Sequence, residues 1–180
     1  GNKLNQLSKS TATQNTLIID DNSSCKFIKV EGSFLVKNGL RVTKKNSIFE
    51  KNYWKINASH DGYLKKYNSI HEREIEFYPE KMLFIGIDKI IKKKGNFNYK
   101  FDIRFHLEPN TKLMKTQDNK TILLELHDEG WKFTSDNYEI NIDNGLYFGK
   151  KNTYTENQNI FISGITNSQN NYIRWELIKI

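Results

Sequence analysis

The stretch 101–107 reads FDIRFHL, with an apolar residue at every second position. Its aromatic and aliphatic residues fall on one side of an extended chain and its polar residues on the other. This period of two is typical of a β-strand with one buried face. The same alternation occurs at 138–143 and at 173–178. The pattern therefore predicts half-buried antiparallel strands.

Turn-forming residues interrupt the chain at short intervals, as at Asn38-Gly39 and Asn144-Gly145. This spacing predicts about ten to twelve strands, of which 48–58, 70–78 and 99–107 are examples. No long segment has a helical period. We therefore expect an all-β fold, a large antiparallel β-sandwich. Core positions are expected for all three tryptophans, Trp54, Trp131 and Trp175.

The composition fits one domain over residues 1–180. The net charge of +7 suits an anionic partner, although many lysines and few arginines suggest that codon bias contributes. Cys25 is the single cysteine, so no internal disulfide can form, and cytosol and periplasm both remain open. No apolar run reaches the length of a membrane span, and no membrane partner is expected.

Histidine and arginine are scarce in this chain and gather in a few places. Residues 59–63 read SHDGY, and His71 and Arg73 follow shortly after. If the two strands that end and begin here are neighbours, His60, Asp61, His71 and Arg73 cluster at one end of a sheet. Arg73 shares a strand face with apolar residues, where an unpaired guanidinium is costly. We therefore expect Asp61 or a neighbouring acid to pair with it.

Three readings of this cluster remain open. A structural ion-pair network is favoured, and a ligand-facing role is the main alternative. A metal site made of His60, Asp61 and His71 is the third, but it lacks the close ligand spacing of strong metal motifs. The opposite strand face carries Glu72, Glu74 and Glu76 and is expected to be solvated.

Arg104 and His106 occupy the polar side of the stretch 101–107. A solvated strand face is the favoured reading. The alternative is a polar sheet face that touches sugar acids or a neighbouring domain. No Gly-rich phosphate loop, nucleophile elbow or His-Glu-x-x-His motif is present, and Cys25 has no histidine nearby. No catalytic residue is predicted.

Several stretches resemble the C-terminal β-domain of heparinase II/III-like polysaccharide lyases. Residues 9–21 read KSTATQNTLIIDD and are similar to that family's Arg-Ser-Thr-Ala-x-His-Asn-Thr-Leu segment. The stretches 59–63 with 71–73, 103–107 and 173–177 follow in the family's order. Each motif is weak alone, but the ordered set extends over nearly the whole chain.

The resemblance implies a β-sandwich that follows an (α/α) toroid in a longer polypeptide. Family members cleave acidic polysaccharides by β-elimination, with most catalytic groups in the toroid and in strands upstream of this segment. This chain is then expected to be inert alone, with the toroid and an acidic polysaccharide as its partners. The resemblance also implies a bacterial protein, periplasmic or cytoplasmic.

One departure from the family concerns zinc. Gln14 stands where the family usually has a histidine that helps to bind zinc in some members. Glutamine cannot replace imidazole as a strong zinc ligand, so no cofactor is expected. Gln14 and Asn15 remain candidates for hydrogen bonds to a sugar or to the toroid.

Two other functions compete with a lyase domain. The first is a free-standing carbohydrate-binding sandwich for anionic glycans. The second is a basic nucleic-acid-binding β-protein, which is weaker because no aromatic-basic stacking motif stands out. The sequence leaves the polysaccharide substrate and the oligomeric state open.

Overall fold

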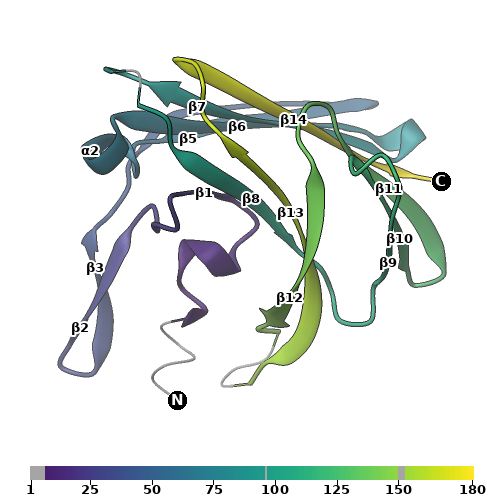
Figure 1. Cartoon of the computed structure of the whole chain (residues 1–180), viewed down its shortest axis with the longest axis horizontal. Helices are drawn as coiled ribbons and strands as arrows, with labels where there is room; N and C mark the ends of the chain where they lie inside the picture. The colour runs from purple at the N-terminus through teal and green to yellow at the C-terminus, as the bar shows by residue number, and fades with distance from the viewer. Residues whose placement is uncertain (1–6, 96, 150–152) are drawn as a thin grey trace.

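The computed structural model describes residues 7–95, 97–149 and 153–180. Of these, 61% lie in strands and 7% in helices, which confirms the all-β prediction. Two antiparallel sheets lie face to face, and Figure 1 shows the larger one above the smaller. Within the described ranges, no helix has the length and apolar character that a membrane crossing requires.

The larger sheet has eight strands and the smaller has four. In spatial order, the larger contains β4 (Val42–Glu50), β5 (Tyr53–His60), β6 (Ser69–Tyr78), β7 (Leu83–Lys92), β14 (Asn170–Lys179), β11 (Glu129–Ser135), β10 (Thr121–Leu126) and β9 (Lys112–Lys115). The smaller contains β1 (Leu17–Ile19), β8 (Lys100–His106), β13 (Thr155–Ile165) and β12 (Ile140–Tyr147). A separate hairpin joins β2 (Lys26–Val30) to β3 (Ser33–Asn38), and the short helices are η1 (Thr11–Thr13), α2 (Leu64–Tyr67) and η2 (Pro79–Lys81).

The prediction of a single strand over 48–58 is wrong. Lys51 and Asn52 form a two-residue turn that ends β4 and begins β5. Both flanking segments have strand-forming side chains, so periodicity alone runs through the turn. The predicted strand 70–78 is confirmed as β6, and 99–107 as β8.

The core lies between the two sheets and is filled by aliphatic and aromatic side chains. Both layers contribute to it: Ile90, Ile122, Phe133, Ile173 and Trp175 from the larger sheet, and Phe101, Ile103, Ile140, Ile160 and Ile162 from the smaller. Trp175 lies directly over Gly86 of the neighbouring strand. A Cβ atom at Gly86 would lie 2.0 Å from Trp175 Cζ2, so only glycine leaves room for the indole.

The edge of β1 that faces away from β8 is closed by a side chain. The hydroxyl of Tyr63 donates a 2.9 Å hydrogen bond to the carbonyl of Leu17. Tyr63 is buried, and this burial raises the pKa of its phenol. β1 therefore has little backbone left for a further strand, whereas β4 at the edge of the larger sheet is exposed along its length.

Candidate functional site

A fully buried carboxylate, Asp88 on β7, organises the polar cluster. Arg73 lies opposite it on β6 and donates from Nε to Oδ1 at 2.8 Å and from Nη2 to Oδ2 at 3.0 Å. His71 Nε2 and Trp175 Nε1 also contact the carboxylate, at 2.6 and 3.0 Å. Burial would raise the pKa of Asp88, but Arg73 and His71 hold it well below its usual range. The carboxylate thus stays ionised inside the core.

The predicted cluster is confirmed for His60, His71 and Arg73. The prediction that Asp61 or a neighbouring acid pairs with Arg73 is confirmed for a neighbouring acid, Asp88, and not for Asp61. The Asp61 carboxylate binds Arg41 instead, through its backbone N–H at 2.7 Å and its Nε at 3.1 Å. Asp61 follows the end of β5, whereas Asp88 lies beside Arg73 in the ladder. Asp88 alternates with Gly86 and Ile90 on the buried side of β7, and an acid at such a position is the sequence signal that could have identified it.

His60 and His71 lie opposite each other on β5 and β6 and touch through their rings. Gly62 N–H donates to His60 Nδ1 at 3.2 Å, so the other nitrogen, Nε2, carries the proton. His60 Nε2 therefore donates to His71 Nδ1 at 3.1 Å, and His71 donates onward to Asp88. Burial, with His71 nearby, lowers the pKa of His60 from 6.5 to about 4.

These contacts do not favour a metal at His60, Asp61 and His71. All four ring nitrogens of the two histidines are engaged, and Asp61 turns toward Arg41. In the part of the chain that the structure describes, no group of three or more His, Cys, Asp or Glu side chains is arranged to hold a metal ion.

Arg73 also connects the larger sheet to the segment that precedes β1. Its guanidinium lies 6.0 Å from the ring centres of both Phe105 and Trp175. Its Nη1 donates to the carbonyl of Asn15. The side-chain oxygen of Asn15 in turn accepts the backbone N–H of His106 at 2.7 Å. Asn15 is therefore held from both layers of the sandwich.

The neighbouring residues fasten the same segment to β8. His106 Nε2 lies 3.0 Å from the carbonyl of Ala12, and burial lowers the pKa of His106. Gln14 Nε2 donates to the carbonyl of Ser8 at 2.9 Å. The predicted residues Gln14, Asn15, Arg73 and His106 are thus brought into one region, in which protein groups already occupy Gln14 Nε2 and the side-chain oxygen of Asn15.

The outward face of the smaller sheet is less solvated than predicted. Arg104 is half-buried, with its guanidinium 5.2 Å from the ring centre of Phe161 and its charge near Asp102 and Asp143, at 3.7 and 4.0 Å. His106 is also half-buried. The expectation of a solvated face here is wrong, because the Phe161 ring lies against Arg104 and the segment before β1 contacts His106.

Three buried side-chain atoms on this part of the smaller sheet have no hydrogen-bond partner among the described residues: Arg104 Nε, His106 Nδ1 and Asn157 Oδ1. Asn157 is 7% exposed and lines a hollow of about 280 Å³ together with Gly145 and Glu156. Of the three atoms, Arg104 Nε is a donor and Asn157 Oδ1 is an acceptor.

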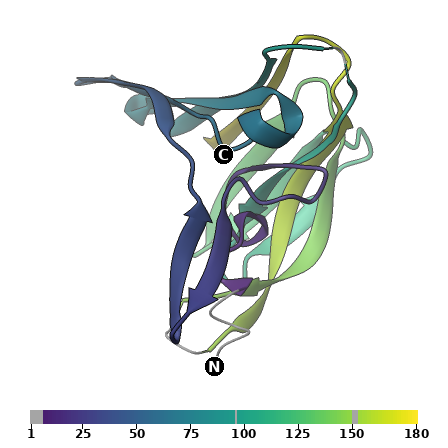
Figure 2. The ribbon, with the colours of Figure 1, turned by 90° about the vertical axis from the view of Figure 1, so that its left-hand side faces the viewer.

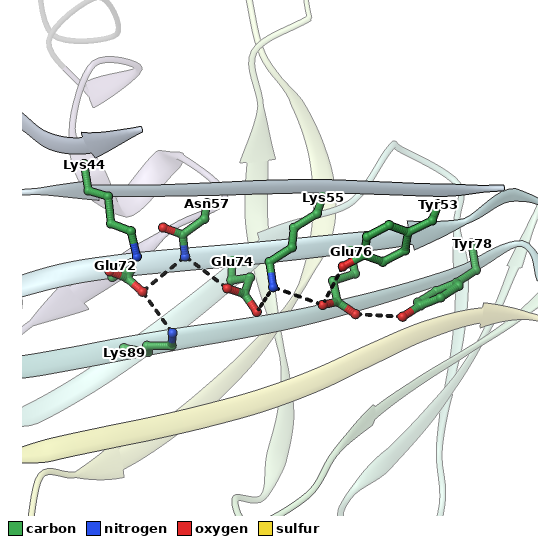
Figure 3. Close-up of polar contacts among 9 residues, drawn as sticks. All are labelled: Lys44, Tyr53, Lys55, Asn57, Glu72, Glu74, Glu76, Tyr78 and Lys89. Atoms are coloured by element: carbon green, nitrogen blue, oxygen red, sulfur yellow. Dashed lines mark hydrogen bonds and ion pairs between the residues drawn. The ribbon is translucent and has the colours of Figure 1, made fainter. Parts of the chain in front are cut away.

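The prediction of a solvated glutamate face on β6 is also wrong. Figure 3 shows a ladder in which Glu72, Glu74 and Glu76 are bridged by lysine and amide groups. Asn57 Nδ2 lies 3.1 Å from both Glu72 and Glu74, and Lys55 lies 2.9 Å from Glu74 and 3.3 Å from Glu76.

Both ends of the ladder are closed by further partners. Lys44 and Lys89 contact Glu72, and the hydroxyls of Tyr53 and Tyr78 donate to Glu76 at 3.0 and 2.9 Å. Burial would raise the pKa of Glu72, but hydrogen bonds from Lys89 and Asn57 lower it to about 2. Carboxylates and ammonium groups balance, so we interpret this face as structural.

The comparison with sequence families and the comparison with solved structures both match heparinase-like proteins. The sequence model described as heparinase II/III-like, C-terminal, matches residues 1–176. The structure of a heparan sulfate lyase, HepC from Pedobacter heparinus, aligns with 98% of this chain at a TM-score of 0.76 and 14% identity. The heparinase III BT4657 gene product aligns with 99% at a TM-score of 0.69 and 14% identity.

The alignments cover only part of each solved protein. The chain spans 25% of the HepC lyase and 26% of the BT4657 product. A further heparinase III structure aligns with all of this chain at a TM-score of 0.69 and 15% identity. The aligned region is 25% of that protein. A search of curated proteins finds no match.

Proposed function

The chain belongs to the heparinase II/III-like C-terminal family, and from that premise we propose that it is the C-terminal β-sandwich domain of a polysaccharide lyase. The chain spans about a quarter of the lyases that it resembles in structure. We infer that an (α/α) toroid in the same polypeptide supplies the rest of the cleft and the main catalytic groups.

The reaction proposed for the whole protein is β-elimination on an acidic polysaccharide. A base removes the proton α to a uronic-acid carboxylate, a second group neutralises that carboxylate, and an acid assists the leaving oxygen. The candidate groups in this chain are poorly placed for such steps. The side chains of His60, His71 and Asp88 are hydrogen-bonded in a chain from one to the next. Tyr63 is buried, and its hydroxyl donates to the carbonyl of Leu17. We therefore propose that the chain alone is inert.

We propose that this domain forms one wall of the substrate cleft and holds that wall in a fixed position. The observation that carries this proposal is the double contact of Arg73, which binds Asp88 in the core and the carbonyl of Asn15 in the family-like segment. The segment is thereby fixed beside Arg104, whose side chain is 22% exposed. A guanidinium in that position suits a carboxylate or sulfate of the sugar chain.

Zinc has no part in this proposal. Gln14 occupies the position of the family's histidine, and its amide nitrogen already donates to the carbonyl of Ser8. An amide offers a far weaker ligand than imidazole, so the residues present do not fit the ion.

The direct test compares the pure chain with the full polypeptide. Both would be incubated with heparan sulfate, chondroitin sulfate and alginate, and the ultraviolet absorbance of the unsaturated uronide product would be followed. We expect product from the full polypeptide alone. Steady product formation by the isolated chain, abolished by a substitution such as His60→Ala, would overturn the proposal of an inert domain.

A free-standing carbohydrate-binding domain is the second candidate. The partly exposed Arg104 side chain on the outward face of the smaller sheet, together with the net charge of +7, favours it. Calorimetric titration of the isolated chain with heparan sulfate oligosaccharides distinguishes the two functions. Binding that is lost in Arg104→Gln, without any toroid present, would favour this candidate. A preference for DNA at matched salt would favour a nucleic-acid partner instead.

A further inference from the structure

The inner face of the larger sheet, which carries the core, is left uncovered at its β4–β5 end. Figure 2 shows this side of the sheet reaching beyond the strands of the lower layer. Four apolar side chains there are exposed to solvent: Val42 at 62%, Phe49 at 65%, Trp54 at 45% and Ile56 at 48%. The prediction that Trp54 lies in the core is therefore wrong.

Two of these side chains, Phe49 and Trp54, belong to a row of aromatic rings that crosses four strands. Phe49 and Trp54 are 6.2 Å apart, Trp54 and Phe77 are 5.3 Å apart, and Phe77 stacks on Phe84 at 4.2 Å. Only the β4–β5 end of the row is exposed, and the same sheet face continues into the core. A continuous apolar surface of this kind is uncommon on a monomer and marks a contact site.

The geometry of the rings favours a protein over a sugar as the occupant. Phe49 and Trp54 meet at 72°, and Trp54 and Phe77 at 63°, so these rings do not form a flat platform for a sugar ring. The indole N–H of Trp54 donates to the carbonyl of Glu50 and is not available to a hydroxyl. An interdigitating apolar protein surface fits tilted rings better.

The free edge of β4 adjoins this face. Glu50 and Tyr53 close the two-residue turn as a hydrogen-bonded pair, so the backbone groups of Ser47 and Phe49 point away from β5. No described backbone group bonds to them from that side. An incoming segment can therefore bind both the apolar face and the strand edge.

We propose that this surface, the β4 face (Val42, Phe49, Trp54 and Ile56 with the free edge of β4), docks the preceding domain of the same polypeptide. The inference rests on the proposed function, in which this chain is one part of a longer lyase. The solved lyases that it resembles are about four times as long as the aligned region. Their remaining length offers an occupant within the same molecule.

Charge also favours this occupant over a second copy of the chain. Lys45 shares the inner face, and Lys51 lies in the adjoining turn, both exposed. Two copies meeting here would oppose these lysines and the net charge of +7 on each. The partner surface should be apolar with an acidic rim.

Hydrogen exchange of the full polypeptide, compared with the isolated chain, tests the proposal. We expect the amides of Ser47 and Phe49 to exchange at least about tenfold more slowly in the full polypeptide. Phe49→Asp should abolish that protection. Ile48→Asp is the matched control, because Ile48 directly precedes Phe49 in β4, points to the opposite face and is 40% exposed. This variant should leave the protection intact.

Three outcomes would overturn the proposal: equal exchange in both proteins, protection of the isolated chain that rises with its concentration, or protection that appears only after oligosaccharide is added. Lyase activity of the same full polypeptide is measured separately. An active lyase with an unprotected β4 would overturn this inference alone, whereas an inactive polypeptide with a protected β4 would overturn the proposed function alone.

Discussion

The guanidinium of Arg73 lies side-on against the carboxylate of Asp88, which stands 15 positions later on the neighbouring strand. This pair lies at the centre of a connected set that runs from His60 through His71 to Asp88 and from Arg73 to Asn15. Because Asp88 is fully buried, every contact to it substitutes for lost hydration. The pair therefore links the stability of the sheet to the position of the segment before β1.

Removing Arg73 should destabilise the domain clearly. Arg73→Ala leaves the buried Asp88 carboxylate without its bidentate partner, and breaking such a pair typically costs about 3–5 kcal/mol. Urea unfolding followed by circular dichroism measures the change. The control is Lys93→Ala, since Lys93 is exposed and its loss should cost under about 1 kcal/mol. Equal stability of the two variants would contradict the structural role of the pair.

Adding one methyl group at Gly86 should displace Trp175. In Gly86→Ala the new Cβ would lie 2.0 Å from the indole, and overpacking of this kind typically costs about 1–3 kcal/mol or more. We expect a lower melting temperature and an altered near-ultraviolet spectrum. Gly39→Ala is the matched control, because its Cβ would meet Val36 at an ordinary 3.4 Å. An unchanged tryptophan signal in Gly86→Ala would mean that the sheet absorbs the methyl group elsewhere.

Stability should fall as the pH decreases from about 6.5 to about 4. The pKa of His60 is lowered from 6.5 to about 4, so in this window the unfolded chain binds the proton more readily than the folded one. The full effect is on the order of 3 kcal/mol. His60→Gln should show a shallower dependence in urea unfolding at successive pH values. The lowered pKa values of Asp88 and Glu72 affect stability only at more acidic pH, near and below the ordinary carboxyl range.

The isolated chain should not retain zinc. Metal analysis after dialysis should find well below one zinc per chain, because Gln14 offers an amide whose nitrogen is already bonded to Ser8. Gln14→His should restore weak binding at most. A full equivalent of zinc in the unmodified protein, lost in Gln14→Ala, would show that the amide position does take part in a metal site.

Sequence periodicity identified the strands and the facing of His60 and His71, because both follow from alternation along two adjacent strands. It missed Asp88 as the partner of Arg73, because that choice depends on which third strand lies beside β6. It also placed Glu72 in solvent, because the lysines and amide that cover it come from three different strands. Trp54 shows the remaining limit: alternation gives the face of a residue but not whether another layer covers that face.

The edges of β1 and β4 differ in whether a further strand can be added to them. Tyr63 closes the edge of β1, so a further strand can join only at other edges, among which β4 is long and exposed. A polypeptide emerges from the ribosome N-terminus first, and domains generally fold as they are made. A preceding domain would then be complete before β4 is synthesised. The apolar face of β4 and β5 would then meet a finished surface as it forms, which would shorten the time during which chaperones or other chains can reach it.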